Sequence, residues 1–113
     1  MGEEWVMKPL DFHIAYVSWG DGGKRRPVLI LSERGNEAYV YQITTRYQSK
    51  SDVVRSKYLA INDWRQSGLD KPSYIDTDRI ISLPITTIDL VPIGELSEKD
   101  AQRLFEFTLA EDF

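Results

Sequence analysis

The feature that most limits the possible folds is a series of strand-like segments within residues 12–45, separated by two short turns. Three segments have this character: 12–19 (FHIAYVSW), 27–32 (PVLILS) and 38–45 (AYVYQITT). Glycine-containing clusters at 20–23 (GDGG) and 34–37 (RGNE) lie between them. Alternating or continuous apolar runs bounded by turn residues indicate β-strands, and short connections favour antiparallel neighbours. We therefore predict an antiparallel meander, with Pro27 as the first residue of its second strand, where proline is tolerated.

The rest of the chain adds shorter elements. Further strands are predicted at four segments: 58–61, 72–75, 79–84 and 89–93. Residues 46–57 are polar and basic without a sustained period, which predicts a mobile loop around a short strand or turn. After the first of these strands, Asn62 or Asp63 can cap a short helix that reaches Ser67, and Gly68 can end it in the left-handed conformation.

The clearest helix signal is at the C-terminal end, in LSEKDAQRLFEFTLAE. Ser97 followed three residues later by Asp100 is a capping-box pattern. Four residues share one predicted helix face: Ala101, Leu104, Phe105 and Thr108. The predicted fold class is mainly β with minor α, a small and strongly curved β-sheet or barrel with a C-terminal helix. A length of 113 residues suits a single domain, which we expect to span 1–113.

Composition excludes most familiar kinds of catalytic site. The chain has no cysteine and one histidine, His13, so thiolate metal sites are absent and a histidine-based metal site is nearly excluded. Neither a phosphate-binding P-loop nor a nucleophile elbow occurs in the sequence. The longest apolar runs are too short to span a membrane, so we expect a cytoplasmic protein that needs no metal or other cofactor.

Charge is distributed unevenly along a chain whose net charge is −4. Residues 24–79 carry 11 Lys and Arg against 7 Asp and Glu, whereas both ends of the chain are acidic. This asymmetry is compatible with a face that binds a polyanion. Solvated charges scattered over the surface explain it equally well.

Three clusters could carry chemistry: Lys24–Arg25–Arg26, Thr44–Thr45–Arg46, and DTDR at 76–79. In a meander, the start of the second strand and the end of the third lie at the same edge of the sheet, so Arg26 and Thr44 can be neighbours. A guanidinium fork and a hydroxyl can together hold the oxygens of a phosphodiester and stabilise charge that grows in its transition state. The alternatives are a surface arginine and an ordinary strand threonine.

The motifs that surround these clusters resemble a known family. DFHIAYVSW, RPVLIL and QITT occupy the positions of the first three strand motifs of the MazF/PemK-like toxins of type II toxin–antitoxin systems. GLDKPSYIDTDRIISLP and IGELSEKD are similar to the later segments of that family. The resemblance covers roughly residues 10–106.

The resemblance implies an SH3-like β-barrel of the PemK, MazF and CcdB type that acts as a homodimer. It implies a ribosome-independent mRNA interferase that cuts single-stranded RNA at a short sequence without a metal, through attack of the ribose 2′-hydroxyl to give a 2′,3′-cyclic phosphate. A small cognate antitoxin protein would neutralise it. By position, Arg26 and Thr44 match catalytic residues of the family, and Asp78 matches an acidic residue of some members.

The chemistry of these side chains suggests separate roles. Arginine stays protonated at neutral pH, so Arg26 suits stabilisation of the phosphorane and Asp78 is the candidate general base. The expected RNA-binding residues are Lys24, Arg25, Thr45, Arg46 and Arg79. A second hypothesis remains open: a non-catalytic toxin on the same barrel that grips a protein such as a DNA gyrase. The short loop GDGGK, which lacks the Gly-x-Glu-Gln motif of many active members, favours that alternative.

Overall fold

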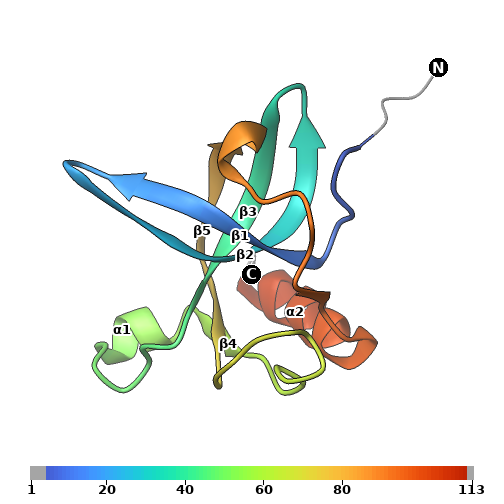
Figure 1. Ribbon diagram of the computed structural model, residues 1–113. Coiled ribbons are helices and arrows are strands. Elements are labelled where there is room, and N and C mark those ends of the chain that lie inside the picture. The colour runs from blue at the N-terminus through green and yellow to red at the C-terminus, as the bar shows by residue number, and fades with distance from the viewer. Residues whose placement is uncertain (1–4, 112–113) are drawn as a thin grey trace.

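A computed structural model describes residues 5–111. Its sheet contains six strands: β1 (Asp11–Trp19), β2 (Gly22–Arg34), β3 (Glu37–Thr44), β4 (Tyr58–Ala60), β5 (Tyr74–Pro84) and β6 (Gly94–Glu95). Every strand pair is antiparallel, and the order across the sheet is β4-β5-β3-β2-β1-β6. The strands curl into a half-barrel from which the β1–β2 hairpin projects (Figure 1). The predicted mainly β class is confirmed. The predicted domain also includes residues 1–4 and 112–113, which lie outside the described part.

The predicted meander is confirmed, and its turns are as short as the glycine clusters suggest. Trp19 pairs with Gly22, so Gly20 and Asp21 alone connect β1 to β2. Gly20 has φ +47°, a left-handed conformation that costs glycine little. The β2–β3 turn uses Gly35 in the same way, with φ +61°. Sequence reasoning therefore found the correct turns because both depend on local backbone chemistry.

Pro27 does not begin its strand, contrary to the prediction. It lies inside β2, which extends back to Gly22, and it pairs with Ile14 of β1. The register between β2 and β3 starts only at Val28 and Gln42, so β2 has a partner on one side alone at the proline. Proline has no backbone N–H to donate, but on the side of β2 that has no partner strand no hydrogen bond is lost. The strand can therefore continue through Pro27.

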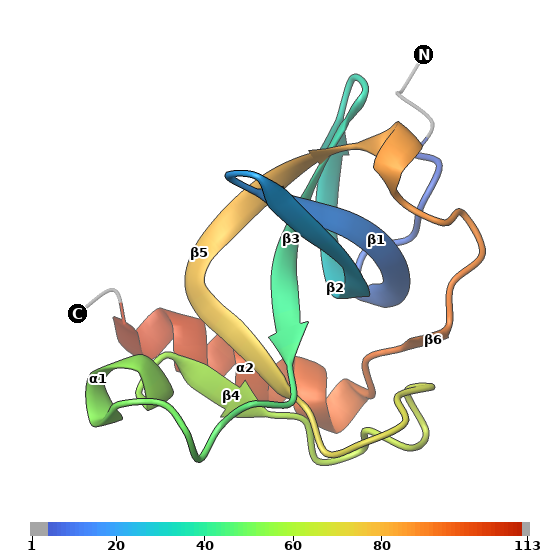
Figure 2. The ribbon, with the colours of Figure 1, turned by 60° about the vertical axis from the view of Figure 1, so that its left-hand side comes forward.

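The two strands predicted at 72–75 and 79–84 form one strand, β5, with a large irregularity. Val40 pairs with Ile81 and Gln42 with Asp76, so one residue of β3 faces a four-residue excursion of β5 at 77–80. Such bulges bend a strand and increase its twist. β5 is accordingly sharply curved in Figure 2. The bulge interrupts the alternation of side chains along β5. For this reason the sequence predicts two strands where the structure has one.

Other expected elements differ more. The loop at 46–57 contains a short helix, α1 (Asp52–Arg55), capped by Ser51. Residues 62–68 form consecutive turns instead of the predicted helix, although Gly68 is left-handed as expected, with φ +85°. The strand expected at 89–93 is absent: a 3-10 turn, η1 (Ile85–Thr87), follows β5, and β6 is the next strand.

The C-terminal helix, α2 (Glu98–Glu111), begins after Ser97 as predicted. The Ser97 hydroxyl accepts a hydrogen bond from the Asp100 N–H at 3.2 Å. The Asp100 carboxylate does not complete the capping box; it turns inward and accepts from the backbone N–H groups of Asn62 and Asp63. The predicted apolar face is partly wrong as well, because Leu104 is buried whereas Phe105 is 61% exposed.

The curled sheet has two apolar clusters, one on each face. The cluster beneath α2 contains Phe12, Leu29, Ile43, Ile75 and Leu104. The opposite cluster includes Ala15, Val28, Val40, Leu83 and Ile88. α2 therefore packs against one face of the sheet only (Figure 2). None of the described helices is long and apolar enough to cross a membrane.

Candidate active site

The pairing of β2, β3, β5 and β4 brings five polar side chains to the face of the sheet that α2 does not cover: Arg26, Gln42, Thr44, Tyr58 and Asp76. Val28 pairs with Gln42, Gln42 with Asp76, and Asp76 with Tyr58. Directly paired residues of antiparallel strands point to the same side of the sheet, and so do residues two apart along a strand. Arg26 lies two positions before Val28 and Thr44 lies two positions after Gln42, so both share this face. The meander geometry thus places them together.

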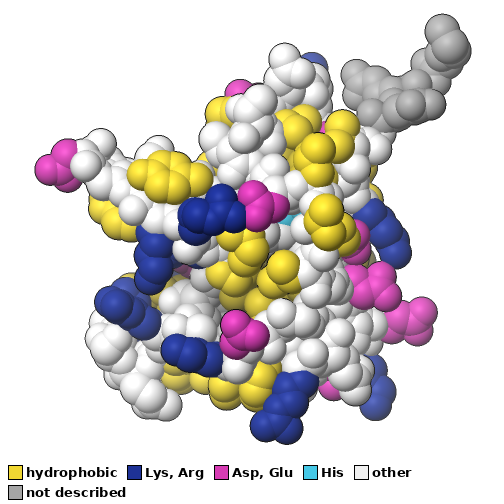
Figure 3. All heavy atoms as spheres, in the orientation of Figure 1, with side chains coloured by type: hydrophobic (Ala, Val, Ile, Leu, Met, Phe, Trp, Pro, Cys, Tyr) yellow, Lys and Arg dark blue, Asp and Glu magenta, His cyan; other side chains and the backbone are white. Residues whose placement is uncertain are grey.

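A cavity of about 570 Å³ opens over this face. Its lining comprises Trp19, Lys24, Arg25, Arg26, Pro27, Gln42, Ile43, Thr44, Thr45, Arg46, Lys50, Tyr58 and Asp76. We call it the basic groove, because five of these side chains are Lys or Arg and one is acidic. Figure 3 shows Lys and Arg side chains around the hollow beneath the β1–β2 hairpin. In a chain of net charge −4, this local excess of positive charge favours an anionic ligand.

Arg26 is held from one side and has unused hydrogen-bonding capacity. Its Nη1 donates to Oε1 of Gln42 at 3.3 Å, and its guanidinium carbon lies 5.7 Å from the centre of the Trp19 ring. Its Nε is buried and has no hydrogen-bond partner among the described residues. A guanidinium has five N–H donors, so the outer nitrogens of Arg26 that line the groove keep hydrogens for a ligand oxygen.

Thr44 is fixed by the backbone that follows it. Its Oγ1 accepts a hydrogen bond from the Arg46 N–H at 3.1 Å. A threonine hydroxyl that accepts one bond can still donate its own hydrogen. Since Thr44 also lines the basic groove, it can offer that hydrogen to the same ligand as Arg26.

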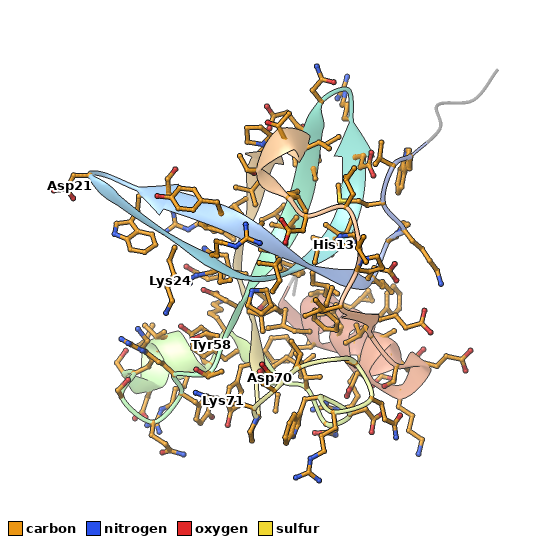
Figure 4. All side chains as sticks on the ribbon, in the orientation of Figure 1. His13, Asp21, Lys24, Tyr58, Asp70 and Lys71 are labelled. Carbon is orange, nitrogen blue, oxygen red and sulfur yellow. The ribbon has the colours of Figure 1, made fainter. Side chains whose placement is uncertain are left out.

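The remaining predicted cations occupy different positions around the groove. Lys24 reaches from the hairpin toward the side of the molecule that carries Tyr58, whereas Asp21 lies at the hairpin tip (Figure 4). Arg25 forms an exposed ion pair with Asp89. Thr45 and Arg46 line both this groove and a neighbouring cavity. Ion pairing leaves Arg25 less available to a ligand than Lys24.

Asp78 and Arg79, the other predicted site residues, do not line the groove. Both are exposed and lie in the 77–80 excursion of β5, where no residue of β3 pairs with them. Asp76 lines the groove instead, and one of its oxygens accepts a hydrogen bond from the Asp78 N–H at 3.0 Å. The catalytic prediction for Asp78 and the RNA-binding prediction for Arg79 stay predictions.

The sequence assigns no role to Gln42 or Tyr58, and it places Asp76 in the cluster at 76–79 without a role of its own. Gln42 could have been found, because it lies two positions before Thr44 and a strand has a period of two. Asp76 required the position of the bulge, which no local pattern gives. Tyr58 required the pairing of β4 with β5, two strands that are separated by the 13 residues 61–73.

Tyr58 is half-buried and lines the groove. Burial raises the pKa of its phenol, and the nearby charges of Asp76 and Asp78 raise it further, while Arg26 opposes them. The neutral phenol is therefore the stable form at physiological pH. No group of three or more His, Cys, Asp or Glu side chains within residues 5–111 could hold a metal ion.

Comparison with known protein families identifies the family to which the chain belongs. Residues 11–106 match the family described as PemK-like, MazF-like toxin of type II toxin-antitoxin system. The chain belongs to this family of toxins. No curated protein sequence matches it significantly.

Two solved structures have the same fold as this MazF-like chain. The Mycobacterium tuberculosis toxin MazF-mt6 is 24% identical, with a TM-score of 0.66 over 86% of this chain and 90% of that one. An endoribonuclease in complex with its cognate antitoxin from Mycobacterial species is 16% identical, with a TM-score of 0.59 over 90% of each chain. The six-stranded half-barrel with a C-terminal helix is thus a MazF-like fold.

Proposed function

We propose that this toxin is a sequence-specific endoribonuclease that cleaves single-stranded mRNA without a metal. The ribose 2′-oxygen attacks the adjacent phosphorus, the bond to the 5′-oxygen breaks, and the products are a 2′,3′-cyclic phosphate and a 5′-hydroxyl. The observation that supports this most is that the Arg26 guanidinium and the Thr44 hydroxyl line the same basic groove. These groups are donors suited to the oxygens of one phosphodiester.

Each side chain has a defined task in this reaction. Arg26 and Thr44 donate to the non-bridging oxygens and stabilise the charge that develops on them as the phosphorane forms. Lys24, Arg25, Thr45, Arg46 and Arg79 are the proposed contacts to the flanking RNA. The proton of the 2′-hydroxyl passes to a carboxylate, for which the sequence predicts Asp78.

The proposed partners follow from the same charge distribution. A solved relative carries a cognate antitoxin, and an acidic antitoxin segment that occupies the basic groove would compete directly with RNA. We also propose a homodimer that works in the cytoplasm, where mRNA is found.

The deciding experiment is to incubate the purified protein with a long single-stranded RNA in EDTA. We expect discrete fragments that end in a cyclic phosphate. Arg26→Ala should lower the cleavage rate by about 10²- to 10³-fold, as loss of a transition-state donor does elsewhere. Arg34→Ala is the matched control, because Arg34 is an exposed arginine at the β2–β3 turn and lies outside the groove.

A second candidate is a non-catalytic toxin that binds a protein such as a DNA gyrase. The two-residue turn Gly20–Asp21 favours it, because the hairpin offers little chain with which to enclose an RNA. Intact RNA together with inhibition of a purified gyrase would contradict the nuclease proposal and support this one.

A further inference from the structure

A carboxylate and a phenol, those of Asp76 and Tyr58, line the basic groove together with Arg26. Asp76 and Tyr58 are directly paired residues of β5 and β4, so their side chains lie next to each other on the face that carries Thr44. A carboxylate and a phenol are the two kinds of group that cleavage by a 2′-hydroxyl needs besides donors to the phosphate: one accepts a proton and one gives a proton.

Their surroundings suit these separate roles. One Asp76 oxygen accepts from the Asp78 N–H, which fixes the carboxylate in orientation. A carboxylate has further lone pairs available to a substrate hydroxyl. The Tyr58 phenol is kept neutral by burial and by the Asp76 charge, and so retains a proton to donate. Arg26 is close enough to influence Tyr58 electrostatically, so one phosphodiester could contact all three side chains.

We propose that Asp76 and Tyr58 are the general base and general acid of the RNA cleavage proposed above, on which this assignment rests. Asp76 takes the proton of the 2′-hydroxyl as the bond from the 2′-oxygen to phosphorus forms. Tyr58 gives its phenolic proton to the 5′-oxygen as the bond from phosphorus to that oxygen breaks. The protonated Asp76 then returns a proton to the tyrosinate beside it, so the pair ends each cycle as it began.

The neighbouring carboxylate is less suited to the role of base. Asp78 is exposed and belongs to the 77–80 excursion of β5, which has no partner in β3, whereas Asp76 is half-buried and is held by strands on both sides. Acid–base catalysis requires a fixed group within hydrogen-bond reach of the transferred proton. The geometry therefore favours Asp76 over Asp78.

The role of Tyr58 can be tested with an RNA whose cleaved 5′-oxygen is replaced by sulfur. A thiolate leaves without protonation because thiols are far more acidic than alcohols. Tyr58→Phe should slow cleavage of ordinary RNA by about 10²-fold or more and leave cleavage of the sulfur-containing RNA near the wild-type rate. Tyr39→Phe is the control, since Tyr39 is a half-buried strand tyrosine outside the groove. Equal losses on both substrates would overturn the acid assignment and indicate a structural role.

The role of Asp76 is tested by parallel variants. Asp76→Asn should lower the cleavage rate by about 10²-fold or more, and Asp76→Glu should restore part of that loss. Asp70→Asn is the control, because Asp70 is an exposed aspartate of the loop before β5 (Figure 4). A large loss in Asp78→Asn with full activity in Asp76→Asn would overturn the assignment and support Asp78 as the base.

A measurement on the protein alone separates this inference from the function on which it rests. Tyrosinate absorbance, measured as the difference between wild type and Tyr58→Phe, follows the titration of this phenol. Asp76→Asn should lower the pKa of Tyr58, because it removes a negative charge that raises that pKa. An unchanged titration would contradict the pairing. If this shift occurs but the wild-type protein leaves RNA intact, the nuclease function fails while the Asp76–Tyr58 contact stands. If Tyr58→Phe and Asp76→Asn both cut RNA at the wild-type rate, only the inference fails.

Discussion

At the level of single residues, the groove depends on side chains whose hydrogen-bonding capacity is only partly used. Arg26 has an unpaired Nε, and Thr44 accepts a bond while its hydroxyl hydrogen remains available. Fixed donors stabilise a developing charge without reorganisation, which is why they contribute so much to catalysis. The contact of Arg26 with Gln42 and its position over Trp19 supply the fixation.

The Thr44 hydroxyl provides a residue-level prediction. Thr44→Val keeps the shape of the side chain and removes the donor, so the cleavage rate should fall by about 10²-fold. Thr44→Ser keeps the hydroxyl and should retain most of the activity. The measurement is the initial rate of cleavage of a labelled single-stranded RNA. Equal rates for the serine and valine variants would show that the hydroxyl does not touch the substrate.

The sequence could predict that Arg26 and Thr44 line the same groove. The short glycine turns determine the meander, and the meander brings the start of β2 and the end of β3 to the same edge of the sheet. The sequence could not predict Asp76 in preference to Asp78. These two aspartates are two positions apart and would share a face in a regular strand; the bulge at 77–80 separates them. Bulge positions depend on pairing across the whole sheet, which local patterns do not encode.

At the level of elements, α2 is attached to the loop after β4 by one buried carboxylate. Asp100 is 1% exposed and accepts from the N–H groups of Asn62 and Asp63, at 3.2 and 2.9 Å, and from Arg103 at 2.8 Å. Arg103 also donates to the Ala60 carbonyl at 2.7 Å. This network joins the start of the helix to the end of β4 and so supports the strand that carries Tyr58.

Removal of the Asp100 carboxylate should therefore be costly. Asp100→Ala leaves two part-buried N–H groups without their acceptor and the Arg103 guanidinium without its buried carboxylate partner, so we expect the free energy of unfolding to fall by about 3–5 kcal/mol. Urea unfolding followed by circular dichroism measures the change. Glu98→Gln, an exposed position in the same helical turn, should change it by less than about 0.5 kcal/mol. Similar small losses in both variants would contradict a structural role for this network.

A close contact between two backbone segments makes a further element-level prediction. A β-carbon at Gly68 would lie 1.9 Å from the Ile93 carbonyl oxygen, and this glycine has φ +85°. Gly68→Ala should lower the free energy of unfolding by about 3–5 kcal/mol, because the backbone must move. Gly35 also has a left-handed φ, of +61°, but has open space around it. Gly35→Ala should therefore lower the free energy of unfolding by about 1–2 kcal/mol, the cost of a left-handed alanine. Thermal unfolding of the two variants should rank them in this order; the reverse order would refute the contact.

At the level of the whole molecule, an acidic protein concentrates positive charge in one groove. Five Lys and Arg side chains line it, against one aspartate. Composition alone could not reveal this, because sequence-distant cations at 24–26, 46 and 50 converge only once β2 and β3 have paired. The sequence indicated a basic middle region but not which of its cations face a ligand.

Convergence of these cations predicts how RNA binding depends on salt. Each phosphate contact to a single strand contributes about −0.7 to the slope of log affinity against log salt concentration, so five cations set a limit of about −3.5. The affinity of the slow-cleaving Thr44→Val variant for single-stranded RNA should be measured by fluorescence anisotropy across a salt series. Lys24→Gln in that background should make the slope shallower by about 0.7. Lys99→Gln, an exposed lysine of α2 outside the groove, should leave it unchanged. A slope of log affinity against log salt concentration near zero for Thr44→Val would mean that the groove does not bind the RNA backbone. Binding of phosphates releases counterions, which makes affinity depend on salt.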